Sequence, residues 1–179
     1  MSEIRVVHAR GDGFSRGMQV GAELQELIQD SIAFYHRYLD RRGVSSEQLQ
    51  DLLTPYLLAA ETAYPDMMNV LKGMSVAALV PVLELFAINA FEELEPLLES
   101  PEGQLLFLQK KEGYTQRPAT PDRCSSVSVR TPDGGTLLAH NEHWLAGDSD
   151  NVAVVVDHPA DGRVSVASPR SFAACRRSA

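Results

Sequence analysis

Apolar residues recur at helical spacing through most of the first hundred residues of the chain. Between Met18 and Tyr38 they fall three or four positions apart, as they do on one face of an α-helix. Arg41-Arg42-Gly43 then supplies a cationic last turn and a glycine stop. Ser45 and Gln48 have the spacing of a capping box, which marks a helix start. The pattern predicts helices at residues 18–38, 45–63, 65–73 and 80–98, of which the last is the most apolar.

Beyond residue 122 the pattern changes to strand-like segments that are separated by turn residues. Segments 123–130 and 137–144 flank Thr131-Pro132-Asp133-Gly134-Gly135-Thr136, a dense turn signal, and together they predict a β-hairpin. Weak alternation near the start of the chain and two later valine-containing runs predict further strands at residues 3–8, 151–157 and 163–167. The sequence therefore predicts an α+β protein in which helices precede most of the strands.

Cys124 lies at the head of the first hairpin strand, after a segment that is almost wholly helical. If Thr131 pairs with Thr136 across the turn, each step back along one strand matches a step forward along the other. Cys124 then lies opposite His143, with Cβ atoms roughly 4.5–5.5 Å apart. A register slip of one residue would move His143 to the other face, so this contact depends on the turn.

Composition narrows the classes of partner. The chain has 179 residues, 44% of them hydrophobic, and a net charge of −8, which argues against nucleic acid as the main partner. No apolar run approaches the length of a membrane span. The start of the chain has no secretory pattern, so we expect a cytoplasmic protein whose two cysteines, Cys124 and Cys175, are free thiols.

Two segments have only a weak resemblance to known kinds of ligand site. Residues 9–17 are rich in glycine but lack the Gly-Lys-Ser/Thr ending of a phosphate loop, so we predict no nucleotide cofactor. His140 and His143 are three residues apart on a strand, which places them on opposite faces. Since no third ligand is evident, we predict no metal.

Four segments together resemble the N-terminal half of the acyl-coenzyme A:6-aminopenicillanic acid acyltransferase family, also called peptidase family C45. Phe14–Gly21 is similar to an Arg-Gly-x-x-x-Gly segment of that family, and Tyr64–Met74 to a proline-containing helix that ends in Gly-Met. Leu85–Leu94 resembles a helix with Asn and Glu. Cys124-Ser125-Ser126 together with Ala139–Trp144 resembles the nucleophile strand and its partner, with His143 where the family has Asp.

The resemblance implies a self-processing N-terminal-nucleophile hydrolase. Cleavage between Arg123 and Cys124 would expose Cys124 as the nucleophile, and Asn141 and His143 on the partner strand would complete the catalytic residues. The substrate would be a small-molecule amide or acyl compound, and no cofactor is implied. The implied fold is the start of an αββα sandwich, truncated, with a helical pro-segment at 1–123, a catalytic β-region at 124–167 and an irregular tail at 168–179.

Two other hypotheses fit the same residues. The chain could be a truncated, inactive relative that self-associates through an exposed sheet edge. It could instead be a helical interaction module with a small β-appendage. Self-cleavage before Cys124 distinguishes the hydrolase from both.

Overall fold

The computed structural model of this protein describes residues 4–91, 94, 125–141, 151–163 and 165–171. The chain divides into two compact units, one formed by residues 1–111 and 147–179 and the other by residues 112–146. The first unit contains both helices and strands, and the second contains a hairpin, so the predicted α+β class is confirmed. The predicted boundaries at 123 and 167 differ from this division, because strands on both sides of the hairpin belong to the first unit.

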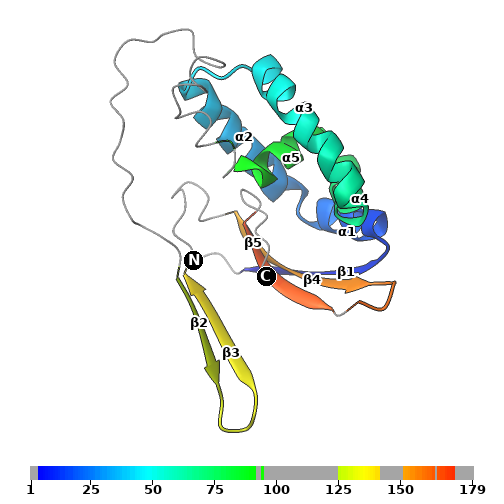
Figure 1. The fold of residues 1–179 in the computed structure, drawn as a ribbon, viewed down its shortest axis with the longest axis vertical. Helices are drawn as coiled ribbons and strands as arrows, with labels where there is room; N and C mark the ends of the chain where they lie inside the picture. Colours follow the sequence, from blue (N-terminus) through cyan, green and yellow to red (C-terminus); the bar gives the residue numbers. More distant parts are fainter. Residues whose placement is uncertain (1–3, 92–93, 95–124, 142–150, 164, 172–179) are drawn as a thin grey trace. The chain divides into compact units, whose positions relative to one another are not determined.

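Five helices lie in the described part of the first unit (Figure 1): α1 (Gly13–Glu23), α2 (Gln25–Arg41), α3 (Ser46–Ala63), α4 (Pro65–Ala78) and α5 (Val82–Asn89). The helix predicted at 18–38 is thus two helices, which meet at the non-helical Leu24. The first of them starts earlier than predicted because the Asp12 side chain accepts a hydrogen bond from the Ser15 N–H at 2.7 Å.

The start of α3 was predicted correctly, and the end of α4 was not. Ser45 and Gln48 exchange hydrogen bonds as a capping box, so α3 begins where the sequence indicates. Pro65 opens α4, but the helix continues past Gly73 to Ala78 and ends at Leu79 in the left-handed conformation. Gly73 does not end α4, because it is used in a contact with α1.

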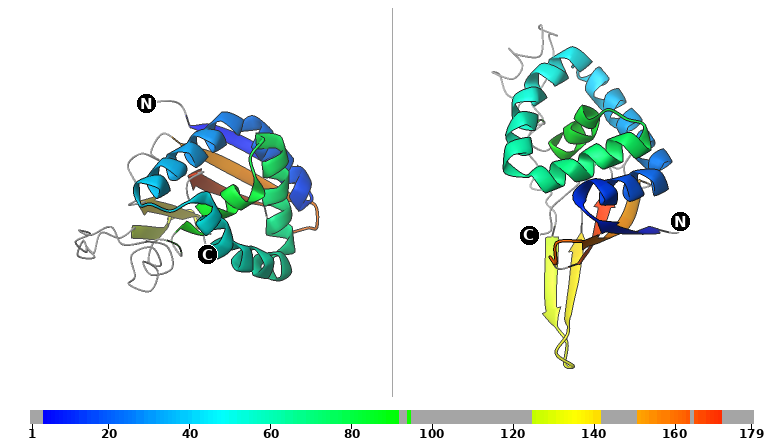
Figure 2. Two further views of the ribbon diagram at one scale, coloured as in Figure 1. Left: turned by 90° about the horizontal axis from the view of Figure 1, so that it is seen from above. Right: turned by 90° about the vertical axis from the view of Figure 1, so that its right-hand side faces the viewer.

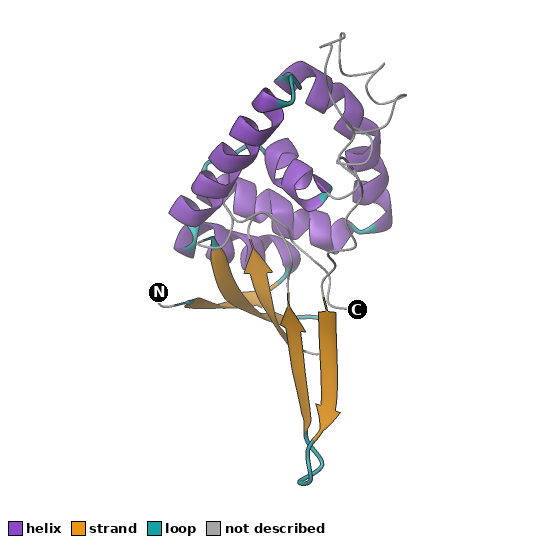
Figure 3. Cartoon of the chain, turned by 90° about the vertical axis from the view of Figure 1, so that its left-hand side faces the viewer, coloured by secondary structure: helices purple, strands orange, loops and turns teal. Residues whose placement is uncertain are grey.

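Three strands of the first unit form one sheet in the order β1-β4-β5. β1 (Arg5–Gly11) runs parallel to β4 (Val152–Pro159), which runs antiparallel to β5 (Val166–Ser171). Residues 168–171 therefore belong to a strand, so the prediction of an irregular tail from residue 168 is wrong for these four residues. The helices lie on one side of this sheet (Figure 3), where Val7 and Ala9 of β1 are buried, as are Ala153 and Val155 of β4.

The second unit contains a hairpin of β2 (Ser125–Arg130) and β3 (Thr136–Asn141). Arg130 pairs with Thr136, so the predicted pairing of Thr131 with Thr136 is wrong by one residue. The turn explains the shift. The Thr131 N–H donates to the Gly135 carbonyl at 3.0 Å, and the Gly134 N–H donates to the Thr131 carbonyl at 3.0 Å. Gly134 takes a positive φ of 86°, as in a three-residue hairpin loop closed by a bulge.

Among the helices that the structure describes, none is both long enough and apolar enough to cross a membrane.

Candidate functional site

The predicted nucleophile and its histidine lie outside the described residues. Cys124 directly precedes β2 in the sequence, and Asn141 is the last residue of β3. The backbone of Asn141 pairs with Ser125, the residue that follows Cys124. The predicted opposition of Cys124 and His143 was derived from a register that the hairpin does not have. What the hairpin does place together is Asn141 and the neighbour of the predicted nucleophile.

A buried arginine, Arg16, joins several elements of the first unit. Arg16 lies on α1 and is only 4% exposed. Its Nη1 donates to the Gly11 carbonyl at 2.9 Å, and its Nη2 donates to Asp66 Oδ2 at 2.9 Å. Its Nε lies 3.4 Å from Asp157 Oδ1, an ion-pair distance without hydrogen-bond geometry. A single guanidinium thus joins the end of β1, the start of α4 and the end of β4.

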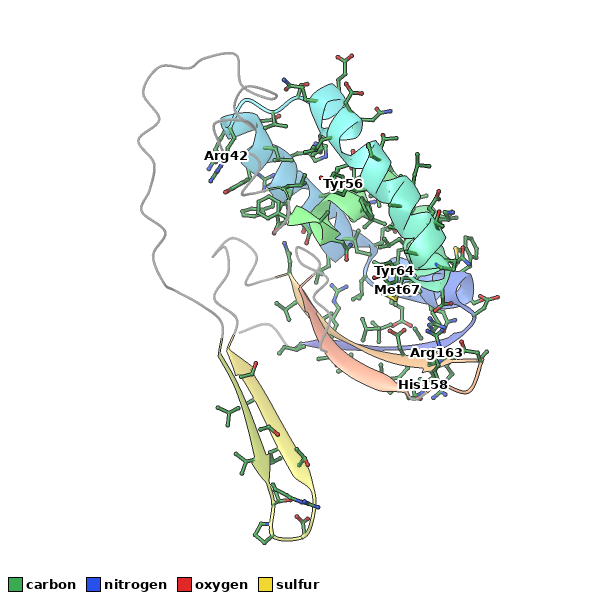
Figure 4. All side chains as sticks on the ribbon, viewed as in Figure 1. Arg42, Tyr56, Tyr64, Met67, His158 and Arg163 are labelled. Carbon is green, nitrogen blue, oxygen red and sulfur yellow. The ribbon has the colours of Figure 1, made fainter. Side chains whose placement is uncertain are left out.

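A second arginine reaches the same carboxylate from the surface. Arg163 follows the turn after β4 (Figure 4), and its Nη2 donates to Asp66 Oδ2 at 2.6 Å. Its Nε also donates to both oxygens of Asp161. Hydrogen bonds from Arg163 and then Arg16 hold the pKa of Asp66 below its usual range, although partial burial opposes them. Hydrogen bonds to Asp161 and then to Asp66 raise the pKa of Arg163, so this group stays charged.

Glycines allow α1 and α4 to approach at backbone distance, and the two helices lie side by side in Figure 2. A Cβ added at Gly17 would overlap the Val70 carbonyl oxygen, and one added at Gly73 would overlap the Phe14 carbonyl oxygen. A Cβ at Gly21 would lie 2.7 Å from the Met74 carbonyl oxygen. The segments Phe14–Gly21 and Tyr64–Met74, which carry two parts of the family resemblance, are therefore packed on each other.

A small hollow, partly open to solvent, lies between α2 and α5. Its described lining is mainly apolar, with His36 Nε2 and Glu84 Oε1 3.3 Å apart at its wall. Asn89 on α5 donates its side-chain amide to the Leu85 carbonyl one turn earlier, at 2.7 Å, so its amide is used within the helix. Of the other polar residues in this resemblance segment, Glu92 and Glu93 lie outside the described residues.

Sequence reasoning missed the cluster of charges around Arg16. Its members are scattered over 148 positions, and nothing in their local spacing connects them. The local signal available was the glycines on either side of Arg16, Gly13 and Gly17, because glycines let another chain segment approach closely. Within the described residues there is no group of three or more histidine, cysteine, aspartate or glutamate side chains that could hold a metal ion.

The chain matches none of the protein-family models and none of the curated proteins with which it was compared.

Proposed function

We propose that this protein is a self-processing amidohydrolase or acyltransferase of the C45 type, with Cys124 as its N-terminal nucleophile. One observation carries the proposal: β2 begins at Ser125, directly after Cys124, and is paired with a strand that ends at Asn141. A nucleophile that becomes a new N-terminus needs a fixed strand directly after it in the sequence. It also needs space on its N-terminal side for the substrate. A hairpin strand that begins directly after Cys124 supports the first of these requirements.

The chemistry needs no cofactor. The Cys124 thiol attacks the Arg123 carbonyl, the peptide nitrogen leaves as the α-amine of Cys124, and the acyl chain passes to sulfur as a thioester. Water hydrolyses this thioester and frees the Arg123 carboxylate and the thiol. The new α-amine, with a pKa near 7.7–8.0 in unfolded chains, can then act as general base for attack on a small-molecule amide. The substrate acyl group is carried on sulfur before water or an amine accepts it.

The hairpin register changes the roles expected on β3. The backbone of Asn141 pairs with Ser125, so Asn141 is in register with the residue that follows the proposed nucleophile. His143 follows two residues later, and its direct opposition to Cys124 is not part of the proposal. An imidazole near a thiol can still lower the pKa of that thiol, which favours the reactive thiolate.

Cleavage before Cys124 would not separate the two pieces under native conditions. β1 lies before the cleavage point and β4 after it, and they are paired over seven residues from Arg5 with Ala153 to Gly11 with Pro159. The ion pair between Arg16 and Asp157 also joins the two pieces. We therefore expect a cleaved protein that stays associated until it is denatured.

The test is the intact mass of the purified chain, measured under denaturing conditions before and after incubation near neutral pH. Fragments 1–123 and 124–179 should accumulate, and both should elute together in native size exclusion. Cys124→Ala should abolish cleavage, and Cys175→Ala should not change it. A folded wild-type chain that stays at its full mass for days would refute the proposed self-processing.

One observation favours the self-associating alternative. Val127 and Val129 of β2 face the same side of the hairpin as Leu137 of β3, and all three are more than half exposed. An apolar face of this kind on a hairpin is an interaction or aggregation risk. The alternative predicts an uncleaved chain whose size increases with concentration, and Val129→Thr should reduce that increase.

The helical-module alternative has less support. β4 places Ala153 and Val155 in the buried core, and its Asp157 pairs with the buried Arg16. A helical segment without β4 would lose both.

A further inference from the structure

Two histidines from sequence positions 150 residues apart meet on the sheet of the first unit. His8 lies on β1 and His158 on β4, where His158 is the register partner of Arg10. His8 and Arg10 are two residues apart on β1, so they share a face of the sheet. His158, the partner of Arg10, therefore lies on that face too, diagonally across from His8. It is the face opposite to the buried Val7 and Ala9. Their ring centroids are 5.6 Å apart, and the ring planes are within 11° of parallel.

The nitrogen atoms of the two rings approach each other edge to edge. His8 Nδ1 lies 3.3 Å from His158 Nε2. The other nitrogen of His158, Nδ1, lies 2.9 Å from the Ser165 hydroxyl. A ring that donates its Nδ1 hydrogen to Ser165 presents an unprotonated Nε2 toward His8. The hydrogen bond to Ser165 is thus of the kind that typically orients a metal-binding histidine through its second ring nitrogen.

We propose that His8 Nδ1 and His158 Nε2 form a two-histidine site for a divalent late transition-metal ion, with water completing its coordination. Two nitrogens bound tetrahedrally at about 2.0–2.1 Å from one zinc ion lie roughly 3.3–3.4 Å apart. The observed separation of 3.3 Å matches this spacing. Imidazole nitrogen suits Zn²⁺, Ni²⁺ and Cu²⁺ and is a poor ligand for Mg²⁺ and Ca²⁺.

Charged residues near the two histidines affect both the pKa of His158 and the binding of a cation. Desolvation, then the positive charges of Arg10 and His8, lower the pKa of His158, while Asp157 raises it. Metal binding requires the neutral imidazole, so the affinity for the metal should fall as the pH is lowered. Arg10 also repels the metal itself, although water screens this repulsion at an exposed site. With only two protein ligands, the site should bind more weakly than a four-ligand structural zinc site.

The experiment is a titration of the full chain with Ni²⁺ alone, followed by the imidazole NMR signals near pH 7.5. Ni²⁺ is paramagnetic, so the His8 and His158 signals should broaden together at less than one equivalent. His36, which faces Glu84 elsewhere in the same unit, supplies a signal that should persist. Broadening of all imidazole signals in parallel, or of neither His8 nor His158, would show that the two rings are only hydrogen-bonded to each other.

Matched variants distinguish a loss of metal binding from a loss of folding. His8→Asn and His158→Asn should each weaken Ni²⁺ binding at least tenfold, whereas His36→Asn should not change it. Ser165→Ala should weaken Ni²⁺ binding by about tenfold, the lower end of the loss expected when a metal-binding histidine loses its hydrogen-bond partner. Arg10→Gln should strengthen it severalfold, because a nearby positive charge is removed while the backbone bonds of Arg10 to Gln19 remain. Unchanged affinity in both His8→Asn and His158→Asn, with native thermal melts, would overturn the proposal.

Discussion

The contact between α1 and α4 and the β2–β3 hairpin are built in opposite ways. α1 and α4 touch through glycines that are over 50 positions apart, at distances where no side chain fits between the backbones. The hairpin is closed by five consecutive residues, Thr131–Gly135, and the Cβ position of Gly134 has nothing within 4 Å. The first contact exists only in the folded protein, whereas the second is specified locally.

This difference matters for the proposed chemistry. The predicted nucleophile directly precedes the locally specified hairpin in the sequence, while the pairing that would hold a cleaved protein together lies in the other unit. Changes in the first unit should therefore affect stability and the association of the cleaved pieces. Changes in the turn should affect the hairpin register and leave the first unit intact.

The largest effect is expected from Gly17→Ala. The added methyl group would overlap the Val70 carbonyl oxygen, and a backbone atom cannot move aside without separating the two helices. We expect a loss of about 3 kcal/mol or more in the free energy of unfolding, at the upper end of overpacking effects. Urea unfolding monitored by far-UV circular dichroism measures it.

Gly134→Ala is the matched control for that prediction. Its new methyl group meets open space, and only the positive φ of 86° disfavours alanine, which costs about 1 kcal/mol within the hairpin. If both variants shift the main unfolding transition equally, the distinction between the two regions is wrong.

A smaller effect is expected from Arg16→Met. The substitution removes the ion pairs to Asp66 and Asp157 and the bond to the Gly11 carbonyl. Breaking a fully buried pair costs about 3–5 kcal/mol, and partial exposure of the two carboxylates reduces our expectation to about 2–3 kcal/mol. Arg163→Met, which alters a side chain that is 52% exposed, should cost less than about 1 kcal/mol. Equal losses in the two variants would contradict the role assigned to burial.

The smallest effect is a dependence on pH through Asp66. Its pKa is lower in the folded protein than in the unfolded chain, so the unfolded state binds more protons as the solution becomes acidic. The contribution is fully present above the unfolded pKa of about 4 and is lost as the pH falls through the folded value. Thermal melts from pH 6 to pH 3 should show the wild type converging on Asp66→Asn. A constant difference between the two proteins over this range would contradict the assignment.

Local signals in the sequence predicted several elements correctly. The capping box at Ser45 and Gln48 starts α3, Gly43 has the positive φ expected of a helix stop, and the Pro-Asp-Gly-Gly turn closes a hairpin. These predictions succeeded because each depends on hydrogen bonds between residues a few positions apart. The break at Leu24 was missed because the apolar period continues across it.

The hairpin register shows how a small local error moves a candidate site. The turn residues were identified, but the bulge formed with Gly134 in a positive-φ conformation shortens the loop by one residue relative to the prediction. That one residue removes the basis for placing His143 opposite Cys124 and places Asn141 opposite Ser125 instead. Sequence pattern alone does not choose between two turns that accept the same residues.

The sequence by itself determined the α+β class, the start of α3 and the hairpin turn, because caps and turns act within a few residues. The tertiary structure alone decided that β1 pairs with β4, that Arg16 is buried against Asp66 and Asp157, and that His8 meets His158. Each of these contacts joins residues 50 to 150 positions apart. No local pattern connects residues so far apart, so the physical cause of these contacts lies in the packing of the folded chain.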